Sequence, residues 1–474
     1  MHRSTIVWFR NDLRLHDNIC LHNALKSANK VYPVYCFDPR HYEETSLGLP
    51  KTGAFRAKFI LESVANLRQN LRDIGADLII RQGHPENIIP SLAKELNAHI
   101  VYASKEVTTE EVEVEIQLEK KLHTLGITLH LEWQSTLFHI NDIPWPIKNL
   151  PVTFTNFRKE TEKLTEIRPL LPTPHEMYAF EEVKTGKLPS LDELGLSTPH
   201  YNPRAALKYK GGESAALHRL DNYLWKKDLL KSYKETRNGM LGDEYSSKLS
   251  AWLAIGALSP RYVYKQIKQY ERERVKNKST YWLIFELLWR DYFRFIAKKY
   301  GKHLFRVSGL QEKGIEYYND LATFDRWKQG ETGVPFIDAN MREINSSGFM
   351  SNRGRQNVAS FLVKDLKVNW TWGASYFESL LIDYDVCSNW GNWNYVAGVG
   401  NDLREDRYFN IMSQAKRYDP QGEFVRHWLP ELSELEGKKI HYPALLDSNT
   451  LDAANIKLGT DYPYPIVNFD RWMY

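Results

Sequence analysis

The sequence changes its hydrophobic period about 130 residues from the N-terminus, and this change limits the folds that the chain can adopt. Before the change, short runs rich in β-branched residues alternate with segments of helical period. The runs are residues 4–9, 31–37, 77–82, 99–104 and 127–133. Two of the helical segments end at Gly75 and Gly126, where a left-handed cap is expected. The alternation predicts a parallel, Rossmann-like α/β domain over residues 1–131.

After this domain the alternation stops. Residues 132–202 contain eight prolines among polar residues, which is typical of a long irregular linker. From residue 203 to residue 474, apolar residues recur at spacings of three and four. The sequence therefore predicts an α/β + all-α protein, in which the linker joins the N-terminal domain to an all-helical domain over residues 203–474.

Composition and charge exclude some classes of protein. The chain has 474 residues, of which 42% are apolar and 26% charged, as in a folded soluble protein of two or three domains. Its net charge of +4 is too small to indicate a nucleic-acid partner by itself, although a local basic face is compatible with it. The absence of a signal peptide or of a long apolar run predicts a cytoplasmic protein that does not bind membranes. Nothing in the sequence indicates an obligate protein partner, so we expect a monomer.

Two further patterns narrow the chemistry. Cys20, Cys36 and Cys387 lack the spacing of a metal site, so we expect buried thiols and no bound metal. The stretch FRNDLRLHDN follows the first predicted strand, where an NAD-binding domain has G-x-G-x-x-G. A pyrophosphate at that turn, and an NAD module of the usual type, are therefore not expected.

Aromatic residues are numerous, with 14 Trp and 27 Tyr. A large core with aromatic residues at its rim accounts for such numbers, and so does a site at which aromatic side chains contact a ligand. The counts alone favour the first explanation, and both remain open at this point.

Three polar segments of the predicted helical domain favour a ligand site. In YWLIFELLWRDYFRF, a carboxylate, an indole and a guanidinium share one helix stripe. MSNRGRQN places amides and arginines at a helix start, where the positive end of the helix dipole attracts anions. In LLIDYDVCSNWGNWNYVAGVGND, Asp385 and Asn389 are one helical turn apart, and Asp383 is placed to pair with a buried arginine. Each segment alone fits a surface ion pair or a capped turn, but together they predict a pocket for a large, flat, polar ligand.

These segments belong to a longer series of motifs. The series, in chain order, is VWFRNDLRLHDN, GDEYSSKLSAWLAIGALSPR, FELLWRDYFRF, TGVPFIDANMRE, SGFMSNRGRQNVASFLVKDL, LLIDYDVCSNWGNWNYVAGVGND and YDPQGEFVRHWLPEL. It resembles the photolyase and cryptochrome flavoproteins over nearly the whole chain. The stretches MSNRGRQNVASFL and DYDVCSNWGNWNYVAGVGND resemble the cryptochrome DASH branch in particular. The resemblance implies a noncovalently bound FAD in the helical domain and DNA as the partner.

The resemblance also implies roles for individual residues. Contacts to the phosphates and ribityl chain of FAD are expected from Tyr233, Ser246, Ser247, Leu249 and Ser250. Contacts to the isoalloxazine ring are expected from Arg290, Asp385 and Asn389, with Asn389 facing N5, and from the Arg355–Asp383 ion pair beside the ring. The residues expected to act in catalysis are Glu286 and Asn352, which close the pocket toward the substrate, and Asn389.

On the substrate side, the resemblance implies that Trp289 stacks on a DNA lesion and that Arg353 contacts a DNA phosphate. Duplex-repairing relatives have a methionine and a tryptophan at the positions of Gln356 and Tyr395. Both residues are more polar here, which weakens the apolar wall for a flipped base. We therefore expect light-driven repair of cyclobutane pyrimidine dimers, preferentially in single-stranded or looped DNA. The alternative is a blue-light photoreceptor that signals through flavin photoreduction.

An electron relay toward the flavin is a further implication of the resemblance. Trp393 and Trp370 match the proximal and middle tryptophans of the family relay, but Tyr317 stands where the distal tryptophan is usual. Tyrosine is harder to oxidise unless its proton can leave. We therefore expect electron transfer to end at Tyr317 with proton loss, or to divert to another aromatic residue such as Trp372 or Tyr318.

The resemblance also implies a light-harvesting antenna between the two domains, and we expect it to be 5,10-methenyltetrahydrofolate. In YASKEVTTEE, Glu106 matches the family glutamate that binds the pterin of the folate. A carboxylate at the end of a strand, before a helix, explains the same residue equally well.

Overall fold

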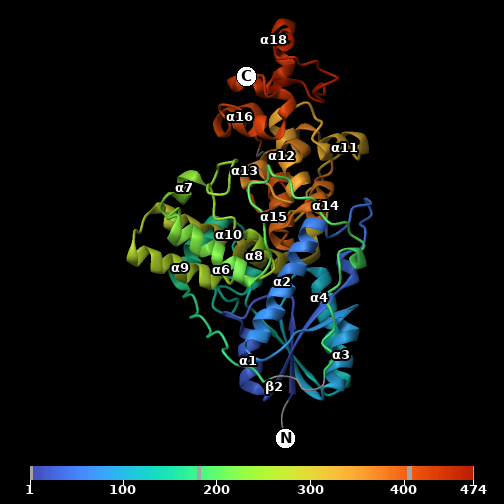
Figure 1. Ribbon diagram of the computed structural model, residues 1–474, viewed down its shortest axis with the longest axis vertical. Helices are drawn as coiled ribbons and strands as arrows, with labels where there is room; N and C mark the ends of the chain where they lie inside the picture. Colours follow the sequence, from blue (N-terminus) through green and yellow to red (C-terminus); the bar gives the residue numbers. More distant parts are fainter. Residues whose placement is uncertain (1–3, 179–182, 403–407, 473–474) are drawn as a thin grey trace.

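The computed structural model describes residues 4–178, 183–402 and 408–472 (Figure 1). In its N-terminal part, parallel strands form one sheet in the order β3-β2-β1-β4-β5. The strands are β1 (Ser4–Phe9), β2 (Lys30–Phe37), β3 (Ile79–Gln82), β4 (Ala98–Ser104) and β5 (Thr128–Glu132). The helices that alternate with them are α1 (Ile19–Ser27), α2 (Ala54–Asp73), α3 (Pro85–Glu95) and α4 (Thr109–Thr124). The predicted parallel α/β domain is confirmed, and Gly75 and Gly126 have the expected left-handed conformation, with φ of 93° and 70°.

Both faces of the central strand β1 are buried, because helices cover both sides of the sheet. Val7 and Phe9 lie in a core that they share with α1, α2 and the helical domain. Ile6 and Trp8 point to the other face and lie in a second core with α3 and α4. One side of the sheet is therefore continuous with the core of the second domain.

The segment 132–202 differs from the expected irregular linker, because it contains helix α5 (Phe154–Leu164). Thr153 caps the helix by accepting a hydrogen bond from the Asn156 amide. Phe154 and Phe157 are buried, and both rings contact Tyr292 of the helical domain. The proline-rich composition hid this short amphipathic helix, whose stability comes from packing rather than from its length. The domain boundaries themselves stay a prediction.

The C-terminal part is helical, as predicted. Its helices are α6 (Glu213–Asp221), α7 (Tyr233–Thr236), α8 (Ser250–Ala254), α9 (Pro260–Glu273), α10 (Lys278–Tyr300), α11 (Leu321–Gln329), α12 (Pro335–Ser347), α13 (Asn352–Ser360), α14 (Trp370–Leu380), α15 (Val386–Ala397), α16 (Ile411–Tyr418), α17 (Glu423–Trp428) and α18 (Ser448–Ala453). No helix within the described ranges is both long enough and apolar enough to cross a membrane. Cys20, Cys36 and Cys387 are buried and not disulfide-bonded, as expected.

Helices α10 and α15 pack closely at a glycine. A Cβ atom added to Gly391 of α15 would lie 2.3 Å from the Phe293 ring of α10. Any side chain at this position would therefore move the two helices apart. The close approach matters because both helices carry residues of the candidate site.

The turn after β1 connects the two domains. The amides of Leu15 and His16 donate to the Glu213 carboxylate at the start of α6, at 3.0 and 2.9 Å. Arg14 is fully buried and donates to the Gly256 carbonyl at 2.8 Å. The stretch that replaces a dinucleotide fingerprint is thus part of the domain interface.

Candidate functional site

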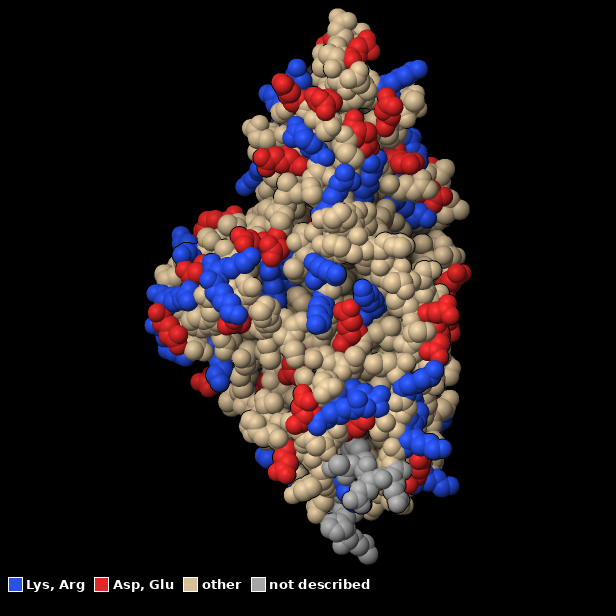
Figure 2. Space-filling model, viewed as in Figure 1, with Lys and Arg blue, Asp and Glu red and all other residues tan. Residues whose placement is uncertain are grey.

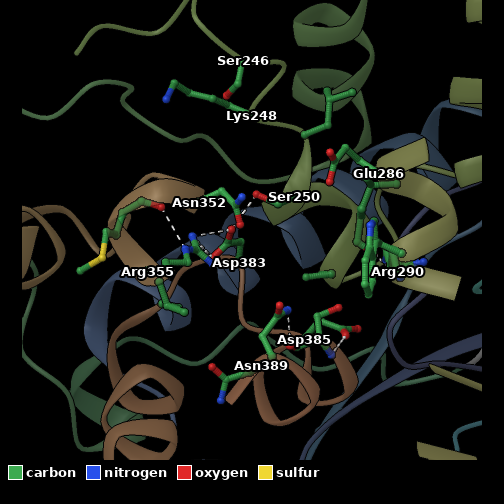
Figure 3. A pocket seen from close by; sticks show the side chains of 18 of the residues that line it. Ser246, Lys248, Ser250, Glu286, Arg290, Asn352, Arg355, Asp383, Asp385 and Asn389 are labelled. Carbon is green, nitrogen blue, oxygen red and sulfur yellow. Dashed lines mark hydrogen bonds and ion pairs between the residues drawn. The ribbon is translucent and has the colours of Figure 1, made fainter. Parts of the chain in front are cut away.

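A cavity of about 590 Å³ opens in the helical domain between α8, α10, α13 and α15 (Figure 3). Its volume is that of a site for a cofactor-sized ligand. The residues predicted from the sequence that line it are Tyr233, Ser246, Ser247, Leu249, Ser250, Glu286, Trp289, Arg290, Asn352, Arg353, Arg355, Gln356, Asp383, Asp385, Asn389, Trp393 and Tyr395. Three separate chain segments, singled out by their polar residues, therefore meet around one cavity.

The ion pair of Arg355 and Asp383 forms one side of the cavity. Nη2 of Arg355 lies 2.9 Å from both carboxylate oxygens of Asp383, and Nε donates to the Met350 carbonyl. The Ser250 hydroxyl donates to Asp383 at 2.6 Å. Asp383 therefore pairs with an arginine, as predicted, and its carboxylate is held from two segments of the chain.

The start of helix α15 forms the floor. Asp385 is its N-cap and accepts a hydrogen bond from the Ser388 amide at 2.7 Å. Asn389 follows one turn later, with its amide donating to the Asp385 carbonyl at 2.8 Å. The side chain of Asn389 donates from Nδ2 to the Ala374 carbonyl at 3.0 Å, which fixes the plane of its amide.

Helix α10 forms the opposite side (Figure 3). Glu286 pairs with Arg237, a partner that the sequence did not indicate, at 2.7 Å, and burial raises the pKa of Glu286. Arg290 donates to the backbone carbonyls of Ser135 and Leu253. These contacts fix the guanidinium at the edge of the cavity.

Trp289 is only partly available to a ligand. Its indole stacks on the Phe154 ring of α5, with centroids 3.7 Å apart and planes 10° apart. Tyr395 meets the same indole edge to face at 6.0 Å. One face of Trp289 is thus covered by the linker helix, which sequence reasoning missed because no helix was expected there.

Lys248 is a residue of the cavity wall that sequence reasoning overlooked, although it stands inside the motif SSKLS. It is 3% exposed, and its ammonium lies over the rings of Tyr245 and Phe349, 3.6 and 4.5 Å from their centroids. Among the described residues neither Lys248 Nζ nor Glu343 Oε2 has a hydrogen-bond partner. Burial lowers the pKa of Lys248 to about 7 and raises the pKa of Glu343 to about 8.

Comparisons with known proteins agree with this site. A family model described as DNA photolyase matches residues 5–175, and one described as the FAD binding domain of DNA photolyase matches residues 282–473. Cryptochrome DASH of Synechocystis sp. is 52% identical over 475 residues, which cover 99% of this chain and 96% of the relative. Cryptochrome DASH of Gloeobacter violaceus is 52% identical over 466 residues, covering 98% of this chain and 93% of the relative. The chain belongs to the photolyase and cryptochrome family, in its cryptochrome DASH branch.

Solved structures of family members have the same fold. The crystal structure of a Synechocystis sp. cryptochrome matches with a TM-score of 0.97 and 52% identity, covering 100% of this chain and 98% of that one. A class III photolyase from Agrobacterium tumefaciens matches with a TM-score of 0.87 and 29% identity, covering 100% and 96%. Membership of the family makes this protein a blue-light flavoprotein with a FAD-binding domain.

The residues of the cavity suit FAD. Ser246, Ser247 and Lys248 line the cavity, and their hydroxyls and ammonium can bind the anionic part of the cofactor, since the ammonium has no hydrogen-bond partner among the described residues. The carboxylate and amide groups at the floor suit the hydrogen-bonding edge of the ring system. The individual contacts to FAD stay predictions.

The predicted relay residues differ in their surroundings. Trp393 is 2% exposed and lines the cavity, whereas Trp370 is fully buried and donates to the Val307 carbonyl at 2.9 Å. Tyr317 is half-buried, burial raises its pKa, and its hydroxyl has no hydrogen-bond partner among the described residues. The described part of the structure thus shows no hydrogen-bonded proton acceptor for Tyr317, and its role as the last electron donor stays a prediction.

Glu106, the predicted antenna residue, is away from the cavity and already bonded. It is 2% exposed and accepts hydrogen bonds from Arg294, within a short ion pair, and from Asn11 at 3.2 Å. These three residues, here called the Glu106 cluster, join the strand end of the α/β domain to helix α10. Glu106 therefore has a structural role in the domain interface, and its role toward an antenna stays a prediction.

One group of described residues has the spacing of a metal site, although no bound metal was expected. Asp38, His84 and Glu86 place ligand atoms within 4.8 Å of one another. Arg40 donates to both carboxylates, at 2.6 Å to Asp38 and 2.9 Å to Glu86. The positive charge of Arg40 thus neutralises the carboxylates that a metal cation would need as ligands.

Proposed function

We propose that the protein is a FAD-dependent, light-driven photolyase that repairs cyclobutane pyrimidine dimers, preferentially in single-stranded or looped DNA. The observation that carries the proposal is the cavity, around which the predicted cofactor and substrate residues meet. When bound, reduced FAD excited by blue light supplies the electron that opens the dimer. The protein holds the cofactor through Arg355, Asp383, Asp385 and Asn389, while Glu286 and Asn352 face the substrate.

A local basic surface supports binding of the DNA backbone. Figure 2 shows Lys and Arg side chains, with acidic ones among them, crowded over α7 and α9. The exposed members from this part of the chain are Lys226, Lys227, Lys231, Lys265, Arg272, Arg274, Lys276 and Lys278. Such a surface attracts phosphates without reading sequence, so the small net charge of the chain does not exclude DNA.

The polar rim of the cavity supports the preference for single strands. Gln356 accepts a hydrogen bond from Arg353 at 2.9 Å, and Arg353 also contacts Asn238 at 3.2 Å. A flipped dimer would therefore meet a hydrogen-bonded polar group where an apolar wall would favour it. Extraction of a base from a duplex costs a few kcal/mol, and single strands avoid most of that cost. Each 1.4 kcal/mol or so of this cost lowers the binding affinity about tenfold.

The test is repair of one lesion in single-stranded, looped and fully paired oligonucleotides at fixed salt, since phosphate contacts depend on salt. We expect faster repair of the first two. Equal rates on all three would contradict the preference. A Gln356→Met, Tyr395→Trp double variant should gain duplex repair. If it gains none while the wild type keeps its preference, these two positions are not the cause.

A blue-light receptor is the second candidate, favoured by the Trp393 and Trp370 positions and by the cryptochrome relatives. The two functions are separated by turnover, because a photolyase repairs many dimers per protein molecule without a partner. The receptor requires photoreduction through Trp393, so Trp393→Phe should nearly abolish photoreduction, whereas Tyr317→Phe should leave most of it. Unchanged photoreduction in Trp393→Phe would contradict the relay.

The antenna, the monomeric state and the cytoplasmic location are part of the same proposal. Binding of methenyltetrahydrofolate near Glu106 would require Arg294 or Asn11 to share that carboxylate. A related archaeal structure, from Sulfolobus tokodaii, is described as holding two FAD molecules, so FAD is the competing antenna. Added folate should produce a near-ultraviolet band and energy transfer to the flavin, and no change would contradict a folate antenna.

A further inference from the structure

Trp390 of helix α15 contacts the relay residue Trp370 but lies outside the predicted relay. The two indoles meet edge to face, with centroids 5.8 Å apart and planes 76° apart. Trp390 is 8% exposed, and the Phe305 ring also meets it edge to face, with centroids 5.0 Å apart. An electron can therefore pass between Trp390 and Trp370 without leaving the core.

The indole nitrogen of Trp390 faces a carboxylate. Nε1 lies 3.3 Å from Oε2 of Glu378 and 3.2 Å from the hydroxyl of Tyr384. A buried cationic indole would be costly without a counter-charge, and an adjacent carboxylate supplies one. The same carboxylate can accept the indole proton, which becomes strongly acidic once the ring is oxidised.

The surroundings of Glu378 favour its acceptance of a proton from Trp390. Burial raises the pKa of Glu378, which makes its carboxylate a better proton acceptor, while Arg56 of α2 acts in the opposite direction. Arg56 also lies over the Tyr384 ring, 4.6 Å from its centroid, and donates to the Glu378 carbonyl. Arg56 of the α/β domain thus supplies a positive charge that partly balances the Glu378 carboxylate.

We propose that Trp390 is a branch of the aromatic relay. Oxidised Trp390 passes its indole proton to Glu378, and the resulting neutral radical stays inside the protein. The inference rests on the proposed relay through Trp393 and Trp370. Excited, oxidised FAD is the oxidant that starts the relay.

The step balances within the chain. Trp390 gives one electron to oxidised Trp370, which returns to a neutral indole. The N–H bond of Trp390 then breaks, and its proton forms an O–H bond on Glu378. A neutral indolyl radical and a carboxylic acid result. Tyr317 lacks such an acceptor among the described residues, so Trp390 is the better place for a long-lived radical.

The test is flash photolysis of the FAD-bound protein, followed by the visible absorption of tryptophan radicals in H₂O and D₂O. The wild type should form a neutral tryptophan radical with a solvent isotope effect. Glu378→Gln should slow that deprotonation by about 100-fold, as expected for the loss of a positioned base. Trp390→Phe should remove the neutral radical and shorten the charge-separated state.

The control is Trp428→Phe, which removes a buried indole of α17 that packs against the ring of the adjacent His427. It should behave as the wild type. Identical radical spectra, lifetimes and isotope effects in Trp390→Phe and the wild type would overturn the inference. If the Trp390→Phe variant loses its flavin, the Glu378→Gln variant tests the inference instead, since glutamate and glutamine have nearly the same shape. Persistent tryptophan radicals in Trp393→Phe would contradict the relay itself, which is a different failure.

Discussion

The cavity of the helical domain and the Glu106 cluster contain the same kinds of side chains but arrange them differently. In the cavity, Arg355 and Asp383 pair at 2.9 Å beside an open volume of about 590 Å³. In the Glu106 cluster, the carboxylate is 2% exposed and both of its oxygens are bonded within the protein. Residue types alone therefore do not distinguish a ligand site from a structural ion pair, whereas open volume beside the polar atoms does.

Glu106→Gln should have the largest effect on stability, because it leaves the Arg294 charge buried without its counter-charge. Loss of one partner of a buried pair costs about 3–5 kcal/mol. We expect a lower unfolding midpoint in urea but the usual flavin content in the folded fraction. Glu119→Gln on the exposed side of α4 is the control. A loss of folate-induced absorbance at unchanged stability would instead make Glu106 an antenna residue and break the comparison.

Asp383→Asn should act mainly on the cofactor. The substitution weakens the charge-assisted bonds from Arg355 and Ser250, which are worth about 1.5–3 kcal/mol. We expect FAD to dissociate about 10- to 100-fold more readily, measured by the recovery of flavin fluorescence on dilution. Asp325→Asn removes a surface pair with Lys328 and should change nothing. Normal retention by Asp383→Asn would show that the ion pair is structural.

Glu343→Gln should change the pH dependence of stability. The pKa of Glu343 is about 8 in the folded protein and ordinarily about 4.5, so its burial disfavours the folded state increasingly as pH rises between these values. From pH 5 to 7 the wild type should lose about 1 kcal/mol per pH unit more than the variant. Above about pH 7, Lys248 loses its own proton and offsets the trend.

Thermal unfolding of the FAD-bound wild type and of Glu343→Gln across pH 5 to 8 measures this difference. Since the histidines are common to both proteins, their titration cancels in the comparison. Parallel curves for the two proteins would show that Glu343 keeps its ordinary pKa.

Much of the fold was predictable because hydrophobic period reports directly on burial. The strand of residues 4–9 was predicted with the bounds that the structure gives it. Helix α5 was missed because it is short, lies among prolines and depends on contacts of Phe154 with distant residues. Long-range contacts of this kind leave no local periodic signal.

The candidate site was predictable to the level of segments rather than of partners. The spacing of Asp385 and Asn389 predicted that they lie one helical turn apart, and the structure confirms this, with Asp385 at the N-cap of α15. The pairing of Glu286 with Arg237 joins residues from different segments and could not be inferred from spacing. Lys248 was overlooked because a lysine in a serine-rich motif resembles a solvated surface residue, and only its 3% exposure shows otherwise.

Gly391 does not line the cavity, but it sets how closely helices α10 and α15 approach each other beside the lining residue Phe293. A Cβ atom at this position would lie 2.3 Å from the Phe293 ring, so the two helices can lie this close only because residue 391 has no side chain. A gap that widens by about 0.5–1 Å forfeits roughly a quarter to a half of the van der Waals attraction between the groups that face each other. The width of the cavity beside Phe293 therefore depends on a residue outside the cavity lining, and a change of that width can begin at Gly391.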